Sequence, residues 1–147
     1  MRREAATAAL FAVVGLGLVL ASAGPGAARD DAPAEIAAKS NPVGALTEKE
    51  VRYFERQFRA KCARCHGADG RGGGEEAAAQ AVPPANFTDA AYMRSRSDGQ
   101  LFYQILMGGG ARSAMPAFGP GSAQAWDEDK IWRMVAFVRR FAQEKAD

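Results

Sequence analysis

The stretch Cys62-Ala63-Arg64-Cys65-His66 decides the fold of this 147-residue chain. It holds both cysteines and the only histidine of the sequence, so all Cys and His side chains lie in one short segment. A closed zinc site normally needs four such ligands, and only three are present. A thioredoxin-like cysteine pair is expected between a strand and a helix, a context that this sequence lacks. A structural disulfide would leave the adjacent histidine without a role.

The same spacing is the attachment signal for covalent haem of the c type. A helical turn ending in the pentapeptide can direct both sulfurs to the two vinyl groups while the next imidazole reaches the iron. We therefore predict one covalent haem c, with Cys62 and Cys65 as thioether anchors and His66 as the proximal iron ligand. Because the chain has no second histidine, the other axial ligand is methionine, another weak donor or solvent.

Met115 is the predicted second ligand. It lies in an irregular glycine-rich segment, residues 108–121, and is followed by Pro116, which fixes the backbone and lacks an amide donor. The other methionines lie in the N-terminal block, before a predicted helix, or within helices where packing is their expected role: Met1, Met93, Met107 and Met134.

A first amphipathic helix is predicted to lead into the pentapeptide. Thr47 and Glu50 form a capping box, in which each side chain can bond to the backbone amide of the other residue. The apolar face of this helix follows the three-and-four spacing: Val51, Phe54, Phe58 and Cys62. Basic residues line another face, where we expect solvation and hold docking of an acidic partner as the alternative: Lys49, Arg52, Arg56 and Arg59.

Two further helices are predicted downstream. The second begins at Ser97, which forms a capping box with Gln100, and ends at Gly108; its apolar face is Leu101, Phe102, Ile105 and Leu106. The last has the acidic residues 127–129 at its start and buries Ile131, Val135, Val138 and Phe141. Residues 67–91 are expected to form a long loop. The sequence shows neither an alternating strand pattern nor an internal repeat.

Residues 1–23 have the pattern of a secretory signal peptide, with a basic start, an apolar stretch and a small-residue cleavage site. We expect cleavage and therefore a periplasmic or otherwise exported protein; an uncleaved membrane anchor is the alternative. Residues 24–46 are predicted to be a linker or an ordered arm with little regular structure, and residues 47–147 the folded domain. The net charge of +2 and the scattered basic residues do not favour nucleic-acid binding.

Residues 47–141 resemble the class I c-type cytochromes. The likeness rests on an amphipathic helix before the pentapeptide, on Met115-Pro116 downstream, and on an aromatic-rich final helix. It implies an all-α fold of three to five helices around one haem, in which Phe54 or Phe58 meets Phe137 where the first and last helices cross. It also implies that a carbonyl of residues 83–87, a proline segment, accepts a hydrogen bond from Nδ1 of His66. Class II cytochromes instead carry the pentapeptide near the C-terminus.

The resemblance implies one-electron transfer by a monomeric His/Met carrier without catalytic residues. Phe87-Thr88-Asp89 and Met115-Pro116-Ala117-Phe118 are similar to segments of small cytochromes that serve terminal oxidases and periplasmic dehydrogenases. The expected partners are a terminal oxidase, a dehydrogenase or a bc-type complex. Alternatives are a haem subunit of a larger complex and, from another class, a gas-binding or peroxidase-type enzyme with an open iron position. Several side chains are candidates to bind the haem propionates, and no choice is made among them: Arg64, Arg94, Arg96, Arg112, Trp126 and Trp132.

Overall fold

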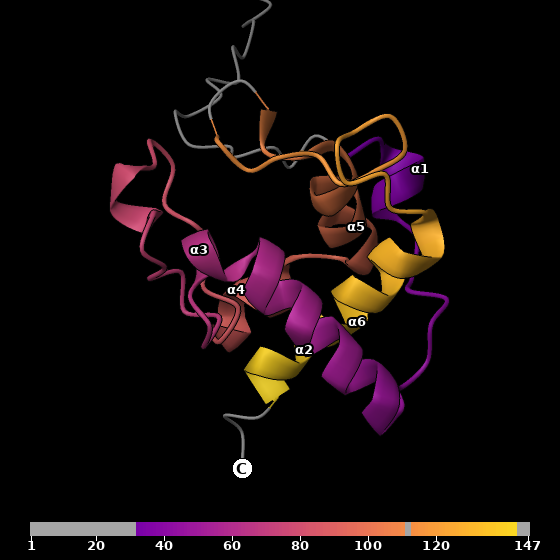
Figure 1. Ribbon diagram of the computed structural model, residues 1–147. Coiled ribbons are helices and arrows are strands. Elements are labelled where there is room, and N and C mark those ends of the chain that lie inside the picture. The colour runs from indigo at the N-terminus through magenta and orange to yellow at the C-terminus, as the bar shows by residue number, and fades with distance from the viewer. Residues whose placement is uncertain (1–31, 111–112, 144–147) are drawn as a thin grey trace, which may run out of the picture.

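The computed structural model describes residues 32–110 and 113–143. Its elements are α1 (Ala34–Ala37), α2 (Glu48–Lys61), α3 (Ala63–His66), the 3-10 helix η1 (Ala77–Ala79), α4 (Ala90–Ser95), α5 (Asp98–Met107) and α6 (Glu128–Gln143). No strand occurs in these described segments, so the predicted all-α class is confirmed (Figure 1).

Helices α2 and α6 cross at the centre of the domain (Figure 1). Phe58 of α2 is 1% exposed, and its ring lies 5.8 Å from that of Phe137 on α6, which confirms the predicted crossing. The start of α2 is also confirmed, because Thr47 and Glu50 form the capping box. The two aromatic rings therefore fix the helix that carries the pentapeptide against the C-terminal helix.

Helix α5 packs on another part of α6. Phe102 and Trp132 stack with ring centroids 4.1 Å apart, and Ser97 and Gln100 form the predicted capping box. This packing holds the C-terminal end of α5 and the segment that follows it opposite the pentapeptide.

Residues 32–46 form an ordered arm over α5 and α6. Ser97 donates a hydrogen bond of 2.6 Å from its hydroxyl to the carbonyl of Ala37, and Nδ2 of Asn41 donates to the carbonyl of Trp132 over 2.9 Å. Gly99 gives α1 room, because a Cβ there would overlap the carbonyl oxygen of Ile36. The described part of this segment packs against the domain, and its regular structure is the single short helix α1.

Helix α4 lies partly in the predicted loop. Its N-cap is Asp89, whose carboxylate accepts hydrogen bonds from the amides of Ala91 and Tyr92. Met93, which was predicted to lie before the second helix, belongs to α4 and is 2% exposed in the core. The loop prediction for residues 67–91 is therefore wrong at its end.

Within the described ranges, no helix has both the length and the apolar character needed to cross a membrane. The predicted signal peptide, residues 1–23, lies outside the described residues.

Candidate functional site

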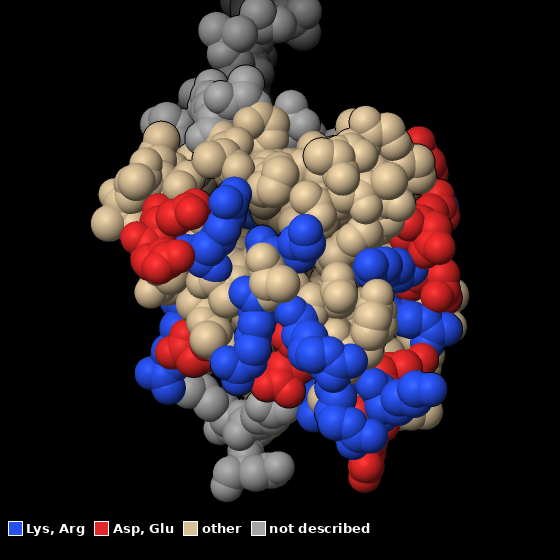
Figure 2. Space-filling model, in the orientation of Figure 1, with Lys and Arg blue, Asp and Glu red and all other residues tan. Residues whose placement is uncertain are grey.

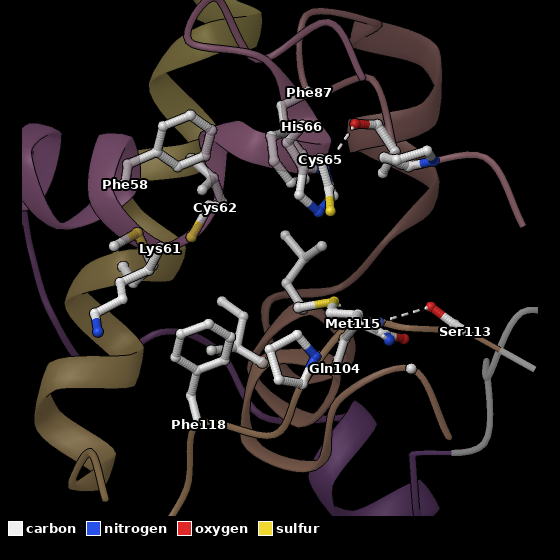
Figure 3. A pocket seen from close by; sticks show the side chains of 18 of the residues that line it. Phe58, Lys61, Cys62, Cys65, His66, Phe87, Gln104, Ser113, Met115 and Phe118 are labelled. Carbon is white, nitrogen blue, oxygen red and sulfur yellow. Dashed lines mark hydrogen bonds between the residues drawn. The ribbon is translucent and has the colours of Figure 1, made fainter. Parts of the chain in front are cut away.

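All four predicted site residues line one cavity: Cys62, Cys65, His66 and Met115. Figure 3 shows Met115 across the cavity from His66 and Cys65. Much of the wall between them is apolar and comes from α2, α5, α6 and the segment after Met115: Phe58, Leu101, Ile105, Phe118, Met134 and Val138. The fold thus brings the pentapeptide and the distant methionine to one apolar space.

His66 is oriented by its own surroundings. Its Nδ1 lies 3.1 Å from the carbonyl oxygen of Ala85, which can only accept, so Nδ1 carries the proton and Nε2 keeps a free lone pair. The ring stacks on Phe87 with centroids 4.6 Å apart. Burial lowers the pKa of His66 below its ordinary value, and the hydrogen bond to Ala85 opposes that shift. The imidazole is therefore held neutral, the form that binds metals.

The acceptor for His66 belongs to the predicted proline segment, but it is the carbonyl of Ala85 and not that of a proline. This carbonyl is positioned by the glycine-rich loop that follows the pentapeptide. Gly72 adopts φ of 80°, and its amide donates to the carbonyl of His66 over 2.7 Å. A side chain at Gly72 would press on the carbonyl of Pro84. The loop thus packs between the pentapeptide and the proline segment.

The same loop covers the back of the pentapeptide. The amide of Gly74 donates to the carbonyl of Cys65 over 3.0 Å, and the amide of Glu76 donates to that of Arg64 over 2.8 Å. These bonds satisfy carbonyls at the end of α3, where a helix leaves its last acceptors free.

Cys62 and Cys65 are free thiols in this structure, so they do not form the structural disulfide considered above. Burial, with a smaller contribution from Cys65, raises the pKa of Cys62 to about 12. Burial and the neighbouring Glu76 raise the pKa of Cys65 as well. Both thiols are therefore protonated, weakly polar groups at the cavity wall.

Met115 is held by backbone bonds to α5. The amide of Gly109 donates to the carbonyl of Met115 over 3.0 Å, and the amide of Phe118 donates to the carbonyl of Ile105, also over 3.0 Å. Gly108 ends α5 with φ of 72°, and a Cβ there would lie 2.6 Å from the carbonyl oxygen of Met115. The glycine is needed because the loop returns so closely to the helix end.

Two methionines reach this cavity, because Met134 lines it as well. Met134 is 1% exposed in the middle of α6, in agreement with its predicted core role. Met107, predicted to pack within a helix, is instead 47% exposed. It is the last residue of α5 and lies two positions after Ile105, which places it near the opposite side of the helix.

Gln104 is a site residue that the sequence analysis missed. It lines the cavity and lies on the same face of α5 as Leu101, three positions earlier. A weak signal was present in the sequence, because Gln104 is a polar residue between the apolar positions Leu101 and Ile105 of the same helix face.

The candidates for binding the haem propionates lie in different places in the structure. Arg64, Arg96 and Trp126 line the cavity, whereas Trp132 is stacked on Phe102 in the core. Arg112 lies outside the described residues.

The basic residues of α2 are exposed to solvent, as the first interpretation expected. Two of them pair with acids one turn earlier, Arg52 with Glu48 at 3.5 Å and Arg59 with Glu55 at 3.0 Å. Figure 2 shows a gathering of basic side chains over α2, with a broad uncharged surface above it.

The donor set of the cavity fits haem. An imidazole nitrogen, a thioether sulfur and two thiols reach an apolar space, and these are the groups that covalent haem of the c type uses. In the described residues no group of three or more Cys, His, Asp or Glu side chains is arranged to hold a metal ion directly.

Comparison with known proteins finds a family match over the part of the chain that contains the cavity. Residues 49–138 match the model of the family described as cytochrome C oxidase, cbb3-type, subunit III. A chain of the reducing HAO-like protein complex of Kuenenia stuttgartiensis has a similar fold, with a TM-score of 0.53 and 23% identity over 68% of this chain. The match covers 46% of that chain. No curated protein matches.

Proposed function

Since the chain belongs to the family of cytochrome c oxidase, cbb3-type, subunit III, and is a class I c-type cytochrome, we propose that it carries single electrons on one covalent haem ligated by His66 and Met115. The family establishes the haem electron-transfer role. We propose the iron ligands, the thioether bonds and the redox partners.

The observation that supports it most is the shared cavity of His66 and Met115 (Figure 3). Nε2 of His66 is left free by the hydrogen bond from Nδ1 to Ala85. Cys62 and Cys65 line the same space and would supply the two thioether bonds. If His66 and Met115 both hold the iron, no position would be left open for a substrate, which would favour transfer over catalysis.

Haem, when bound, supplies reversible one-electron chemistry, and the residues around it set its reduction potential. The carbonyl of Ala85 makes the His66 ring a stronger donor and fixes its orientation. Phe118, Leu101 and Val138 line the cavity with apolar groups, an environment that would disfavour the extra charge of the ferric state. Methionine ligation acts in the same direction and raises the reduction potential.

The proposed partners are redox proteins: a terminal oxidase, a dehydrogenase or a bc-type complex. The family name refers to an oxidase subunit, so residence in a larger complex is the second candidate. We also propose export to the periplasm with cleavage of residues 1–23, and a monomeric carrier. The mass of the purified native protein tests cleavage, because retention of these residues would favour the membrane-anchored subunit.

Optical spectra of the ferric and ferrous protein test the ligation. The wild type should show the red-edge charge-transfer band of sulfur-ligated ferric haem, and Met115→Ala should lose it. Met134→Leu is the matched control, because it removes the second methionine sulfur that lines the cavity and should keep the band. Loss of the band in the Met134 variant alone would reassign the ligand. Rapid binding of carbon monoxide by the wild-type ferrous protein would favour the gas-binding alternative.

A further inference from the structure

Gln104 contacts the sulfur of Met115. Its Nε2 lies 3.8 Å from Sδ of Met115 and 3.2 Å from the carbonyl oxygen of Gly108. The side chain is half-buried in the cavity wall between Leu101 and Ile105. Figure 3 shows Gln104 directly beside Met115.

Both hydrogen atoms of this amide are used. A glutamine NH₂ group has two N–H donors, and here one points to a backbone carbonyl and the other to sulfur. The carbonyl of Gly108 follows the end of α5, where the helix offers no amide for it. The bond to Gly108 therefore fixes the amide, and the donor is already aimed at the sulfur.

A thioether sulfur has two lone pairs. If Met115 ligates iron through one of them, the other can accept the Gln104 hydrogen bond, so the two interactions are compatible. The hydrogen bond withdraws electron density from the sulfur and weakens its donation to the metal. Ferric iron depends more on that donation than ferrous iron, so the bond favours the ferrous state.

The other ties on Met115 act on its backbone. Ser113 accepts from the amide of Met115 over 3.3 Å, and Gly109 donates to its carbonyl over 3.0 Å. These bonds position the loop but leave the thioether group free to rotate. Gln104 thus supplies what the backbone cannot, a fixed direction for the sulfur.

We propose that Gln104 is a positioning residue for Met115, which orients the sulfur by a hydrogen bond from Nε2 and raises the reduction potential of the haem. The proposal rests on the proposed function, because it takes Met115 as the iron ligand.

Gln104→Leu tests it in the haem-loaded protein. Leucine keeps a similar volume and removes both N–H donors. The reduction potential, measured by mediator titration, should fall, with the ferric-to-ferrous ratio at a fixed potential rising roughly threefold. A threefold change corresponds to about 30 mV for one electron. The red-edge band should persist but shift, because the sulfur remains bound in an altered environment.

Gln80→Leu is the matched control. Gln80 also lines the cavity, and its Nε2 donates to a backbone carbonyl, that of Glu76, over 3.0 Å, at a distance from Met115 along the chain and in the loop after the pentapeptide. This variant should keep the wild-type potential and band. A merely structural role of Gln104 would lower the unfolding temperature of Gln104→Leu without moving its reduction potential away from that of Gln80→Leu.

Two results overturn different claims. If Met115→Ala removes the band while Gln104→Leu leaves both potential and band as in Gln80→Leu, then Met115 is the ligand and Gln104 does not act on it. If the wild type lacks the band, the proposed ligation itself fails, and the role of Gln104 fails with it.

Discussion

Nε of Arg139 on α6 donates a hydrogen bond of 2.9 Å to Oδ1 of Asp98 on α5. The same guanidinium donates to the carbonyl of Arg96 over 2.6 Å and to that of Met93. One side chain therefore joins α6 to the start of α5 and to both the interior and the end of α4, and it does so while mostly shielded from solvent.

Replacing Arg139 with methionine should destabilise the domain. The variant keeps much of the alkyl chain but removes the guanidinium donors from two carbonyls and from Oδ1 of Asp98, at a cost of about 2–3 kcal/mol. Denaturant unfolding of the haem-loaded protein measures the loss. Arg94→Met is the control, because Arg94 is exposed at the end of α4 and should tolerate the change within about 0.5 kcal/mol. Equal stability of both variants would show that Arg139 contributes only as a surface residue.

Gly74→Ala should disturb the cover of the pentapeptide. A Cβ at Gly74 would clash with the carbonyl oxygens of Arg64 and Ala63, and these backbone atoms cannot move without disturbing α3. We expect a loss of about 1–3 kcal/mol in unfolding free energy and a lower yield of haem-loaded protein. The adjacent Gly73 is the control, since nothing lies within 4 Å of a Cβ there. A stable Gly74→Ala protein with normal haem content would contradict the tight closure of the loop.

Gly99→Ala should release the N-terminal arm. The added methyl group would overlap the carbonyl of Ile36, and the arm can escape the clash by leaving α5. Hydrogen exchange should then accelerate in residues 34–41, while α2 and α6 keep their protection. Gly44→Ala, which has open space at the Cβ position, should leave exchange as in the wild type. Unchanged exchange in the Gly99 variant would mean that α5, and not the arm, adjusts.

Cys62→Ala and Cys65→Ala should each leave one thioether bond, and the double variant none. Denaturing electrophoresis with haem staining separates the double variant from the two single variants, because only covalently attached haem stays with the unfolded chain and one thioether bond is enough to hold it. The double variant should lose the stain completely. Retained stain in that variant would exclude these cysteines as the attachment points.

The sequence predicted most of the helical frame because its signals are local. Thr47 with Glu50, and Ser97 with Gln100, indicate helix starts by their three-residue spacing. Both capping boxes are present in the structure. Helix α4 was missed because it spans six residues, too few for a hydrophobic period, and has Asp89 as its one clear signal.

The candidate site was predictable where it depends on rare residue types. Cys62, Cys65 and His66 stand out by composition, and the loop around Met115 by its glycines. The carbonyl of Ala85 could not be identified, because every residue has one and only the fold selects which points at His66. The contact of Gln104 with Met115 likewise depends on how the loop returns to α5.

The bond from Asn41 to the carbonyl of Trp132 joins residues 91 positions apart in the chain. Together with the packing of α2 on α6, it means that the earliest described residues complete their contacts only with the latest helix. During synthesis the N-terminal half therefore has no finished partner, and the domain closes as a whole once α6 has been made. A chain that stops before residue 128 lacks the element against which both the arm and the haem-binding helix pack.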